Sequence, residues 1–126
     1  MSDDKNYFVH PTAFVEDNVK IGEGTKIWHL GQIRTGAKLG KNCVLGKSSF
    51  IDTNVSIGNN VKIQNFVSVY HGVIIQDDVF VGPHVCFTND YLPRANYPDW
   101  ELVETLVKKG ASLGANSTIV CGITIG

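Results

Sequence analysis

The sequence has few cysteines, little net charge and no long apolar run, and each of these shortages argues against a class of protein. Its three cysteines are odd in number and widely spaced, which argues against a disulfide framework or a zinc knuckle. The 11 basic and 12 acidic residues are interspersed, so the charge pattern favours neither nucleic acid nor a membrane surface as a partner. No stretch resembles a signal peptide or a membrane span. We therefore expect one soluble domain in the cytoplasm.

Large apolar residues recur at every sixth position. The series is Val9, Val15, Ile21, Ile27, Ile33, Leu39, Leu45, Ile51, Ile57, Ile63, Val69, Ile75, Val81 and Phe87. A smaller inward candidate comes four residues later in each repeat, beginning with Ala13 and including Cys43. A helix would turn the sixth residue to another face, and a strand would also bury the second and fourth. The period therefore predicts an all-β fold, a parallel β-helix of hexapeptide repeats.

Three such hexads are expected to close one triangular coil of eighteen residues, stacked on the next coil at about 4.8 Å. Ile27 would then lie over Val9, and Leu45 over Ile27. Because Gly, Asn and Asp tolerate left-handed backbone, we place the corners at the small and polar residues that follow the large one. The glycines in the first of these positions are Gly22, Gly40, Gly46, Gly58 and Gly82. The alternative is an ordinary β-sandwich, which does not explain a period of six.

Two of the predicted corners carry side chains that a turn does not require. The first stacks Trp28, Gly46, Gln64 and Gly82 beside His29, Lys47, Asn65 and Pro83, and the second stacks Arg34, Asp52, Tyr70 and Thr88 beside Thr35, Thr53, His71 and Asn89. Amide, imidazole and aromatic groups gather around Asn65, Tyr70, His71, His84 and Asn89, which predicts a site there. For any one of these residues taken alone, a solvated corner or a subunit contact is the alternative.

The repeat breaks after Phe87 and resumes, displaced by two residues, at Val107. Counting faces, Val81 and Phe87 occupy two sides of a coil and Val107 the third. We therefore predict that residues 88–106 form an inserted loop that leaves at one corner and returns to finish the same coil. So long a loop in a minimal solenoid is usually functional. The chain is then a single β-helix domain over residues 1–126, with a lead-in at 1–8, regular coils at 9–87 and further coils at 107–126.

The segments around this loop resemble a known family. They read Phe87-Thr88-Asn89-Asp90, Pro93-Arg94, Thr105-Leu106-Val107-Lys108-Lys109-Gly110-Ala111, Gly114-Ala115-Asn116 and Ile119-Val120-Cys121-Gly122. They are similar to the hexapeptide-repeat N-acetyltransferases of nucleotide-linked 3-amino sugars, above all the type acting on UDP-2-acetamido-3-amino-2,3-dideoxy-glucuronate. Relatives acting on dTDP-linked 3-amino-3,6-dideoxyhexoses share much of the pattern.

The resemblance implies a left-handed β-helix, a homotrimer, and active sites between subunits where acetyl-CoA, as co-substrate, meets the nucleotide sugar. It also implies a role in the synthesis of lipopolysaccharide or another surface polysaccharide. No metal is expected. The handedness comes only from the resemblance, since general rules favour right-handed crossovers between parallel strands.

Acetyl transfer from a thioester to an amine needs a neutral amine aimed at the carbonyl carbon, a donor for the developing oxyanion and a route for the released proton. Imidazole is a suitable base near neutral pH, so His84 and His71 are the candidate catalytic residues. They would lie at adjacent corners of the helix or be brought together across the trimer. The alternative, suggested by the resemblance, is that the sugar amine loses its proton to solvent without a protein base.

The candidate ligands of the substrates are short polar, charged and small residues. For the sugar they are Asn65, Tyr70, Asn89, Asp90, Arg94 and Arg34. The amides would hydrogen-bond the sugar or its amine, the aspartate would orient the ammonium, and either guanidinium would bind a uronate carboxylate bidentately. For acetyl-CoA they are Lys109, Gly110, Ala111, Gly114 and Ala115. The lysine would meet a phosphate, and the small residues would let the pantetheine arm lie close to the coil.

The chain departs from the family by stopping at Gly126, at the second position of a hexad. We expect a truncated, fragmentary or naturally short form that lacks part of the acetyl-CoA groove, which leaves open whether this chain acts as an enzyme by itself. Two other classes remain: a zinc protein like the γ-class carbonic anhydrases, and a structural trimer without catalysis.

Overall fold

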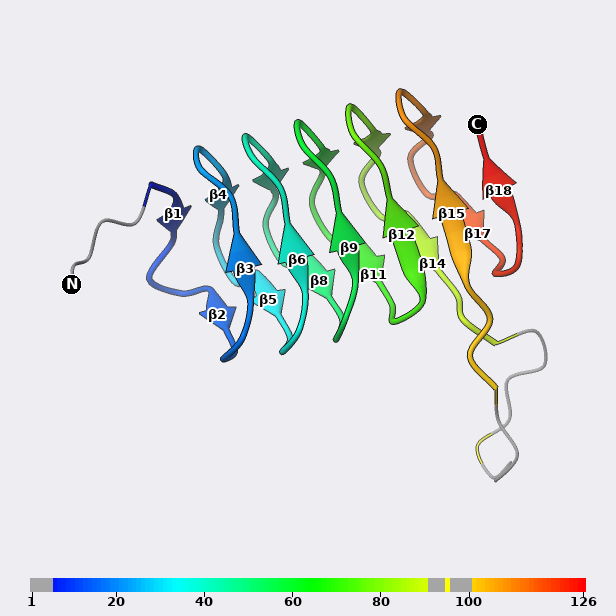
Figure 1. The fold of residues 1–126 in the computed structure, drawn as a ribbon, viewed down its shortest axis with the longest axis horizontal. Helices are drawn as coiled ribbons and strands as arrows, with labels where there is room; N and C mark the ends of the chain where they lie inside the picture. Colours follow the sequence, from blue (N-terminus) through cyan, green and yellow to red (C-terminus); the bar gives the residue numbers. More distant parts are fainter. Residues whose placement is uncertain (1–5, 91–94, 96–100) are drawn as a thin grey trace.

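The computed structural model describes residues 6–90, 95 and 101–126, which form eighteen short strands and no helix. All strand pairs are parallel, and they build three six-stranded sheets, called A, B and C here, that form the sides of a triangular solenoid (Figure 1). The first and the last described residues lie at opposite ends of the solenoid. The predicted β-helix of hexapeptide repeats is therefore confirmed.

Each coil contributes one strand to each sheet. Sheet A contains β1 (Phe8–Val9), β4 (Lys26–Ile27), β7 (Val44–Leu45), β10 (Lys62–Ile63), β13 (Phe80–Val81) and β16 (Ser112–Leu113). Sheet B contains β2 (Phe14–Val15), β5 (Gln32–Ile33), β8 (Phe50–Ile51), β11 (Ser68–Val69), β14 (Cys86–Phe87) and β17 (Thr118–Ile119). Sheet C contains β3 (Lys20–Ile21), β6 (Lys38–Leu39), β9 (Ser56–Ile57), β12 (Val73–Ile75), β15 (Thr105–Val107) and β18 (Thr124–Ile125).

The register between the regular coils is eighteen residues, as the period predicts, whereas strands on either side of the inserted segment pair at a larger separation, as Val81 does with Leu113. Ile27 pairs with Val9, and Leu45 pairs with Ile27. In Figure 1 the near strands run upward and the chain crosses over the top to the far side while the coils advance from left to right. This turn is left-handed, so the solenoid is one of the exceptions to the right-handed crossover rule.

The sixth-position residues fill the interior. Every one of them from Ile27 to Phe87 is buried, whereas Val9 and Ile125, at the two ends of the stack, are only partly covered. The smaller inward positions from Thr25 to Val85 are also buried, and Cys43 is fully enclosed, as expected of a core residue. Such stacked branched side chains supply the main apolar burial of this fold.

Three corners join the sheets. The AB corner comprises residues 10–13, 28–31, 46–49, 64–67, 82–85 and 114–117. The BC corner comprises residues 16–19, 34–37, 52–55, 70–72, the 88–104 segment and 120–123. The CA corner comprises residues 22–25, 40–43, 58–61, 76–79 and 108–111.

Left-handed backbone occurs at the third residue after the large one, as in Gly24 and Asn42, and not at the glycine directly after it. That first glycine has another reason to be small. A Cβ on Gly46 would lie 2.5 Å from Oδ1 of Asn65, which reaches down from the coil above to accept a hydrogen bond from the Lys47 N–H at 2.8 Å. The corners therefore fall at the small and polar residues where we placed them, and within each corner the left-handed conformation lies at the third residue and not at the first glycine.

The chain leaves the solenoid at the BC corner after β14 and returns at β15. β15 pairs with β12 and β18 in sheet C, so Val107 completes the coil that Val81 and Phe87 begin, as predicted. Thr105 and Leu106, expected as the end of the loop, already belong to β15.

Candidate active site

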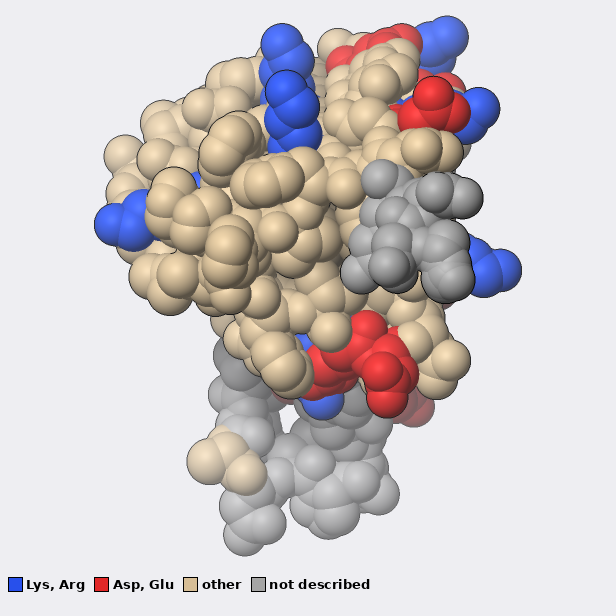
Figure 2. Space-filling model, turned by 90° about the vertical axis from the view of Figure 1, so that its left-hand side faces the viewer, with Lys and Arg blue, Asp and Glu red and all other residues tan. Residues whose placement is uncertain are grey.

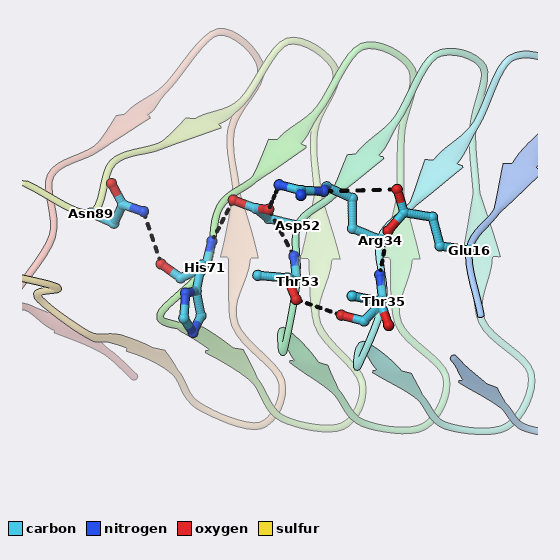
Figure 3. Close-up of polar contacts among 7 residues, drawn as sticks. All are labelled: Glu16, Arg34, Thr35, Asp52, Thr53, His71 and Asn89. Atoms are coloured by element: carbon cyan, nitrogen blue, oxygen red, sulfur yellow. Dashed lines mark hydrogen bonds and ion pairs between the residues drawn. The ribbon is translucent and has the colours of Figure 1, made fainter. Parts of the chain in front are cut away.

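A column of polar side chains runs along the BC corner, and Asp52 lies at its centre (Figure 3). Its Oδ1 accepts hydrogen bonds from the Arg34 guanidinium at 3.0 Å and from the Thr53 N–H at 2.8 Å, and its Oδ2 accepts one from the His71 N–H at 3.1 Å. Asp52 is only 9% exposed. A carboxylate this buried is tolerated because charged and main-chain donors replace its lost water.

The main chain of His71 is held from both sides. Its N–H donates to Asp52, and its carbonyl accepts a hydrogen bond from the Asn89 side-chain amide at 3.1 Å. Figure 3 shows these contacts linking three successive coils in one line. The half-buried imidazole of His71 is thus presented from a fixed backbone.

A pocket of about 200 Å³ opens beside this column. Its lining residues are Tyr70, Cys86, Phe87, Thr88, Asn89 and Asp90. Three of the predicted sugar ligands, Tyr70, Asn89 and Asp90, therefore lie together. The Tyr70 ring is 36% exposed and packs against Phe50 with ring centroids 5.8 Å apart, which fixes one wall of the pocket.

The predicted carboxylate ligand Arg34 is already engaged within the chain. Its guanidinium lies 3.0 Å from Asp52 and 4.0 Å from Glu16. One guanidinium N–H is hydrogen-bonded to Asp52 and Glu16 lies at ion-pair distance, so Arg34 is a structural member of the column. Arg94 lies outside the residues that the structure describes.

The AB corner carries strained residues. Leu30, Phe66 and His84 have positive φ angles of 59°, 60° and 63°. The BC and CA corners place only Gly, Asn or Asp at this position. A left-handed backbone at a larger residue costs about 1–3 kcal/mol, and such strain tends to occur at functional sites. The His84 ring stacks on Phe66 with centroids 5.1 Å apart and an interplanar angle of 9°.

Asn65 has a structural contact that the sequence argument did not include. Its side-chain carbonyl accepts the Lys47 N–H, and its main-chain carbonyl accepts the His84 N–H at 3.1 Å. Asn59 and Asp77 make the same side-chain contact on the CA corner. Asn65 is thus one of a series of bracing residues, and it is exposed next to His84.

His84 and His71 lie at opposite ends of the strands of sheet B, because His84 precedes β14 and His71 follows the neighbouring strand β11. One chain therefore does not bring the two predicted bases, or His84 and the Tyr70 pocket, to one point. The predicted site is divided into an AB half and a BC half.

The predicted acetyl-CoA residues also divide between two corners. Lys109 and Gly110 lie at the CA corner, where Lys109 borders a shallow hollow of about 370 Å³. Gly114 and Ala115 are exposed on the AB corner, one coil beyond His84. Ala111 differs from the expectation, because its side chain is in the core and its main-chain groups bond to Lys108 and Phe80.

Two histidines of the first two coils, His10 and His29, lie against each other at the AB corner. The rings of His10 and His29 have centroids 3.7 Å apart, and Nδ1 of His10 accepts the Thr12 N–H at 3.1 Å. Desolvation lowers the pKa of His10, and the nearby His29 lowers it further. Burial likewise raises the pKa of the Cys43 thiol, as befits a core residue.

Metal ligands are not grouped in the described part of the chain, where no three His, Cys, Asp or Glu side chains are arranged to hold an ion. Nor do the described residues include a helix suited to crossing a bilayer.

The sequence placed Asp52 in one stack with Arg34, but Asp52 was not among the predicted site residues, and the strained Leu30 and Phe66 were missed. The eighteen-residue register was enough to pair Arg34 with Asp52, since opposite charges stacked at that spacing meet. Nothing in the period marks Leu30 or Phe66, because left-handed positions usually carry Gly, Asn or Asp.

Two protein-family models of hexapeptide repeats match the chain. "Bacterial transferase hexapeptide (six repeats)" matches residues 54–89, and "Hexapeptide repeat of succinyl-transferase" matches residues 36–71. Both matches fall on the regular coils, and the first extends two residues into the inserted segment.

A curated protein is similar along nearly the whole chain. The dTDP-3-amino-3,6-dideoxy-alpha-D-galactopyranose 3-N-acetyltransferase of Aneurinibacillus thermoaerophilus is 48% identical over 125 residues, which cover 99% of this chain. The match spans 65% of that protein, which is less than two thirds of its length.

Solved structures share the fold. The acetyltransferase domain of PglB from Neisseria gonorrhoeae FA1090 matches with a TM-score of 0.77 and 21% identity, covering 92% of this chain and 52% of that one. A perosamine N-acetyltransferase from Caulobacter crescentus, solved with CoA and GDP-perosamine, matches with a TM-score of 0.55 and 19% identity, covering 94% and 47%. At these identities the likeness concerns the fold.

Proposed function

Because the chain belongs to the hexapeptide-repeat transferase family, we propose that it transfers an acetyl group from acetyl-CoA to the 3-amino group of a nucleotide-diphospho-amino sugar. The observation that carries this proposal is the 48% identity to a dTDP-amino-sugar 3-N-acetyltransferase over 99% of the chain. The reaction would belong to the synthesis of surface-polysaccharide precursors, such as those of lipopolysaccharide, in the cytoplasm.

The sugar is proposed to be a 6-deoxyhexose rather than a uronate. A uronate carboxylate calls for a cation, and Arg34, the described candidate, is occupied by Asp52 and Glu16. The pocket at Tyr70 and Asn89 is lined by a thiol and aromatic carbon beside its polar groups, which suits a C6 methyl group. The UDP-linked uronate indicated by the sequence motifs is the competing substrate.

Two copies are proposed to complete each site within a homotrimer. A cyclic trimer joins two different patches of the same chain, and the AB and BC corners are the two halves that one chain keeps apart. Docking the AB corner of one copy against the BC corner of the next would place His84 opposite the Tyr70 pocket. The amino sugar would then lie between them.

The chemistry follows from the groups on the two halves. Asn89 and Asp90 would orient the amine, and His84 would accept its proton as nitrogen attacks the thioester carbonyl. The C–S bond then breaks, and CoA leaves as the thiol after taking up a proton. His71 is the second candidate base, and release of the proton to solvent is the alternative route. The exposed Gly114 and Ala115 would let the pantetheine arm reach His84 from the next coil.

The test is an acetylation assay with a small panel of acceptors. We expect the chain to release CoA with dTDP-linked 3-amino-3,6-dideoxyhexoses, and mass spectrometry to find the acetyl group on the 3-amino nitrogen. Faster turnover of the UDP-linked 3-amino uronate would reverse the substrate order. Absence of acetyl transfer to every member of the panel would contradict the proposed function.

A further inference from the structure

Four aromatic side chains gather where the AB corner meets sheet A in the first two coils. Phe8 and Trp28 have ring centroids 5.2 Å apart, Trp28 and His29 are 6.3 Å apart at an interplanar angle of 17°, and His29 lies 3.7 Å from His10. Phe8 is 41% exposed and Trp28 is 37% exposed. The residues Trp28 and His29 of this ring cluster lie on the same AB corner as His84, three coils before it, and have no role in the site described above.

Exposed rings of this kind provide faces on which a flat heteroaromatic group can stack. Nucleobases bind single aromatic side chains in this way without regard to base identity, because every base has a π face. Packing in the hydrophobic core does not explain the cluster, because its rings lie on the surface and pack against one another.

The AB corner lacks negative charge along its whole length. None of its residues is Asp or Glu, and its one lysine or arginine is Lys47, in the third coil. The BC corner by contrast contains Glu16, Asp17 and Asp52. Figure 2 shows acidic atoms at the top right and at the bottom, whereas the left side, the far side of Figure 1 where sheets A and B meet, shows none. This corner suits an anionic ligand.

Lys47 lies between the ring cluster and the proposed acetylation site. Its Nζ is 5.5 Å from the centre of the Phe66 ring, and Asn65 in the next coil holds its N–H. The distance along the solenoid from Trp28 in the second coil to His84 in the fifth is three strand spacings, or about 14 Å. An extended nucleoside diphosphate sugar has a base and a sugar at its two ends and the diphosphate between them, and its length is comparable.

We propose that the AB corner of coils two to five is a track for the nucleotide, with the base on the ring cluster, the diphosphate beside Lys47 and the amino sugar at Asn65 and His84. This inference rests on the proposed function. Acetyl-CoA, passing Gly114 and Ala115, would approach His84 from the opposite end of the solenoid, so the two substrates would share an axis without overlapping.

The first test is direct binding, because it does not require turnover. The chain has two tryptophans, so Trp100→Phe leaves Trp28 as the sole tryptophan. Titration with dTDP and with UDP should quench the fluorescence of Trp28 in a saturable manner. Lys47→Gln should weaken the affinity about tenfold at low salt, and Lys38→Gln, an equally charged change on the face of sheet C, should leave it unchanged.

The second test is steady-state acetylation. Trp28→Ala should raise the KM for the nucleotide sugar about tenfold, with kcat and the KM for acetyl-CoA nearly unchanged, and Trp28→Phe should restore most of the loss. If the wild type acetylates the sugar but Trp28→Ala and Lys47→Gln leave its KM unaltered, the track is wrong and the function stands. If the wild type neither acetylates nor binds dTDP or UDP, both fail.

Discussion

At the scale of single residues, the proposed site includes side chains whose backbone adopts a strained left-handed conformation. His84 adopts a left-handed conformation with φ of 63° and stacks on Phe66, which has the same conformation one coil earlier. Asparagine in this position would be less strained, and Asn116 one coil later shows that it fits. The presence of an imidazole at a strained and exposed corner is the local reason to assign His84 a chemical role.

Replacing His84 by Asn tests that role with little change in backbone preference. We expect acetylation at neutral pH to slow by about a hundredfold, because a positioned base contributes rates of this order. The loss should shrink at higher pH, where the amine is already neutral. His71→Asn is the matched variant on the other corner, and a normal rate in both would favour proton release to solvent.

His10 makes folding stability depend on pH. Its pKa in the folded chain is below the usual 6.5, so on acidification the unfolded chain takes up a proton more readily than the folded one. Protonation of Nδ1 would also remove the acceptor of the Thr12 N–H. We therefore expect the contribution of His10 to stability to be fully present above pH 6.5 and to be lost as the pH falls through its lower folded-state pKa.

Urea midpoints at about pH 7.5 and about pH 5.5 measure this dependence. We expect a lower midpoint at the acidic pH and a smaller decrease in His10→Gln, whereas His84→Gln, outside the ring cluster, should decrease as the wild type does. An equal decrease in all three proteins would remove His10 as the cause.

At the scale of elements, the AB and CA corners both turn the chain and connect one coil to the next. The side chain of Asn65 occupies the space above Gly46, Asn59 that above Gly40, and Asp77 that above Gly58. Each carbonyl or carboxylate oxygen binds the N–H of the residue after the glycine. The small residue in one coil and the polar residue in the next therefore form one structural unit.

Alanine at the glycine should break this unit. In Gly46→Ala the new Cβ would lie 2.5 Å from Oδ1 and 2.9 Å from the main-chain nitrogen of Asn65, so we expect a loss of about 1–3 kcal/mol in the free energy of unfolding. Gly114→Ala is the control, since its nearest new neighbour is Ser117 Oγ at 3.7 Å, and a change within about 0.5 kcal/mol is expected. Similar losses in both variants by urea denaturation would contradict the role of the contact.

At the scale of the whole molecule, one chain divides the proposed site between two corners. The AB corner exposes Leu30 by 57% and Phe66 by 45%, and these apolar surfaces flank the nucleotide track. A neighbouring copy that presents its BC corner would cover them and close the cleft. Catalysis and assembly would then depend on the same surfaces.

Phe66→Asp tests the assembly, and aspartate tolerates the left-handed backbone there. We expect light scattering to show a trimer for the wild type and smaller species for this variant, because a charge would be desolvated at the interface. Ile74→Asp, on the face of sheet C and 39% exposed, should remain trimeric. A monomeric wild type, or equal dissociation of both variants, would argue against this arrangement.

Much of the fold could be predicted from the sequence because each coil repeats the same environment. A period of six assigns the interior, and a register of eighteen assigns the vertical neighbours, so the column of Arg34, Asp52 and Tyr70 and the return of the chain at Val107 were both accessible. The pairing of Tyr70 with Asn89 and Asp90 in one pocket follows from the same arithmetic. The identity of the candidate base did not follow, since periodicity places a histidine but not its partners.

The sequence by itself determined which residues are inside and the order of side chains along each corner, because both depend only on spacing. The tertiary structure decided which residues carry the left-handed backbone, which oxygens brace the coil below, and that Arg34 is paired with Asp52 and Glu16. These depend on torsion angles and on contacts across coils and around the triangle, which spacing along one axis does not specify.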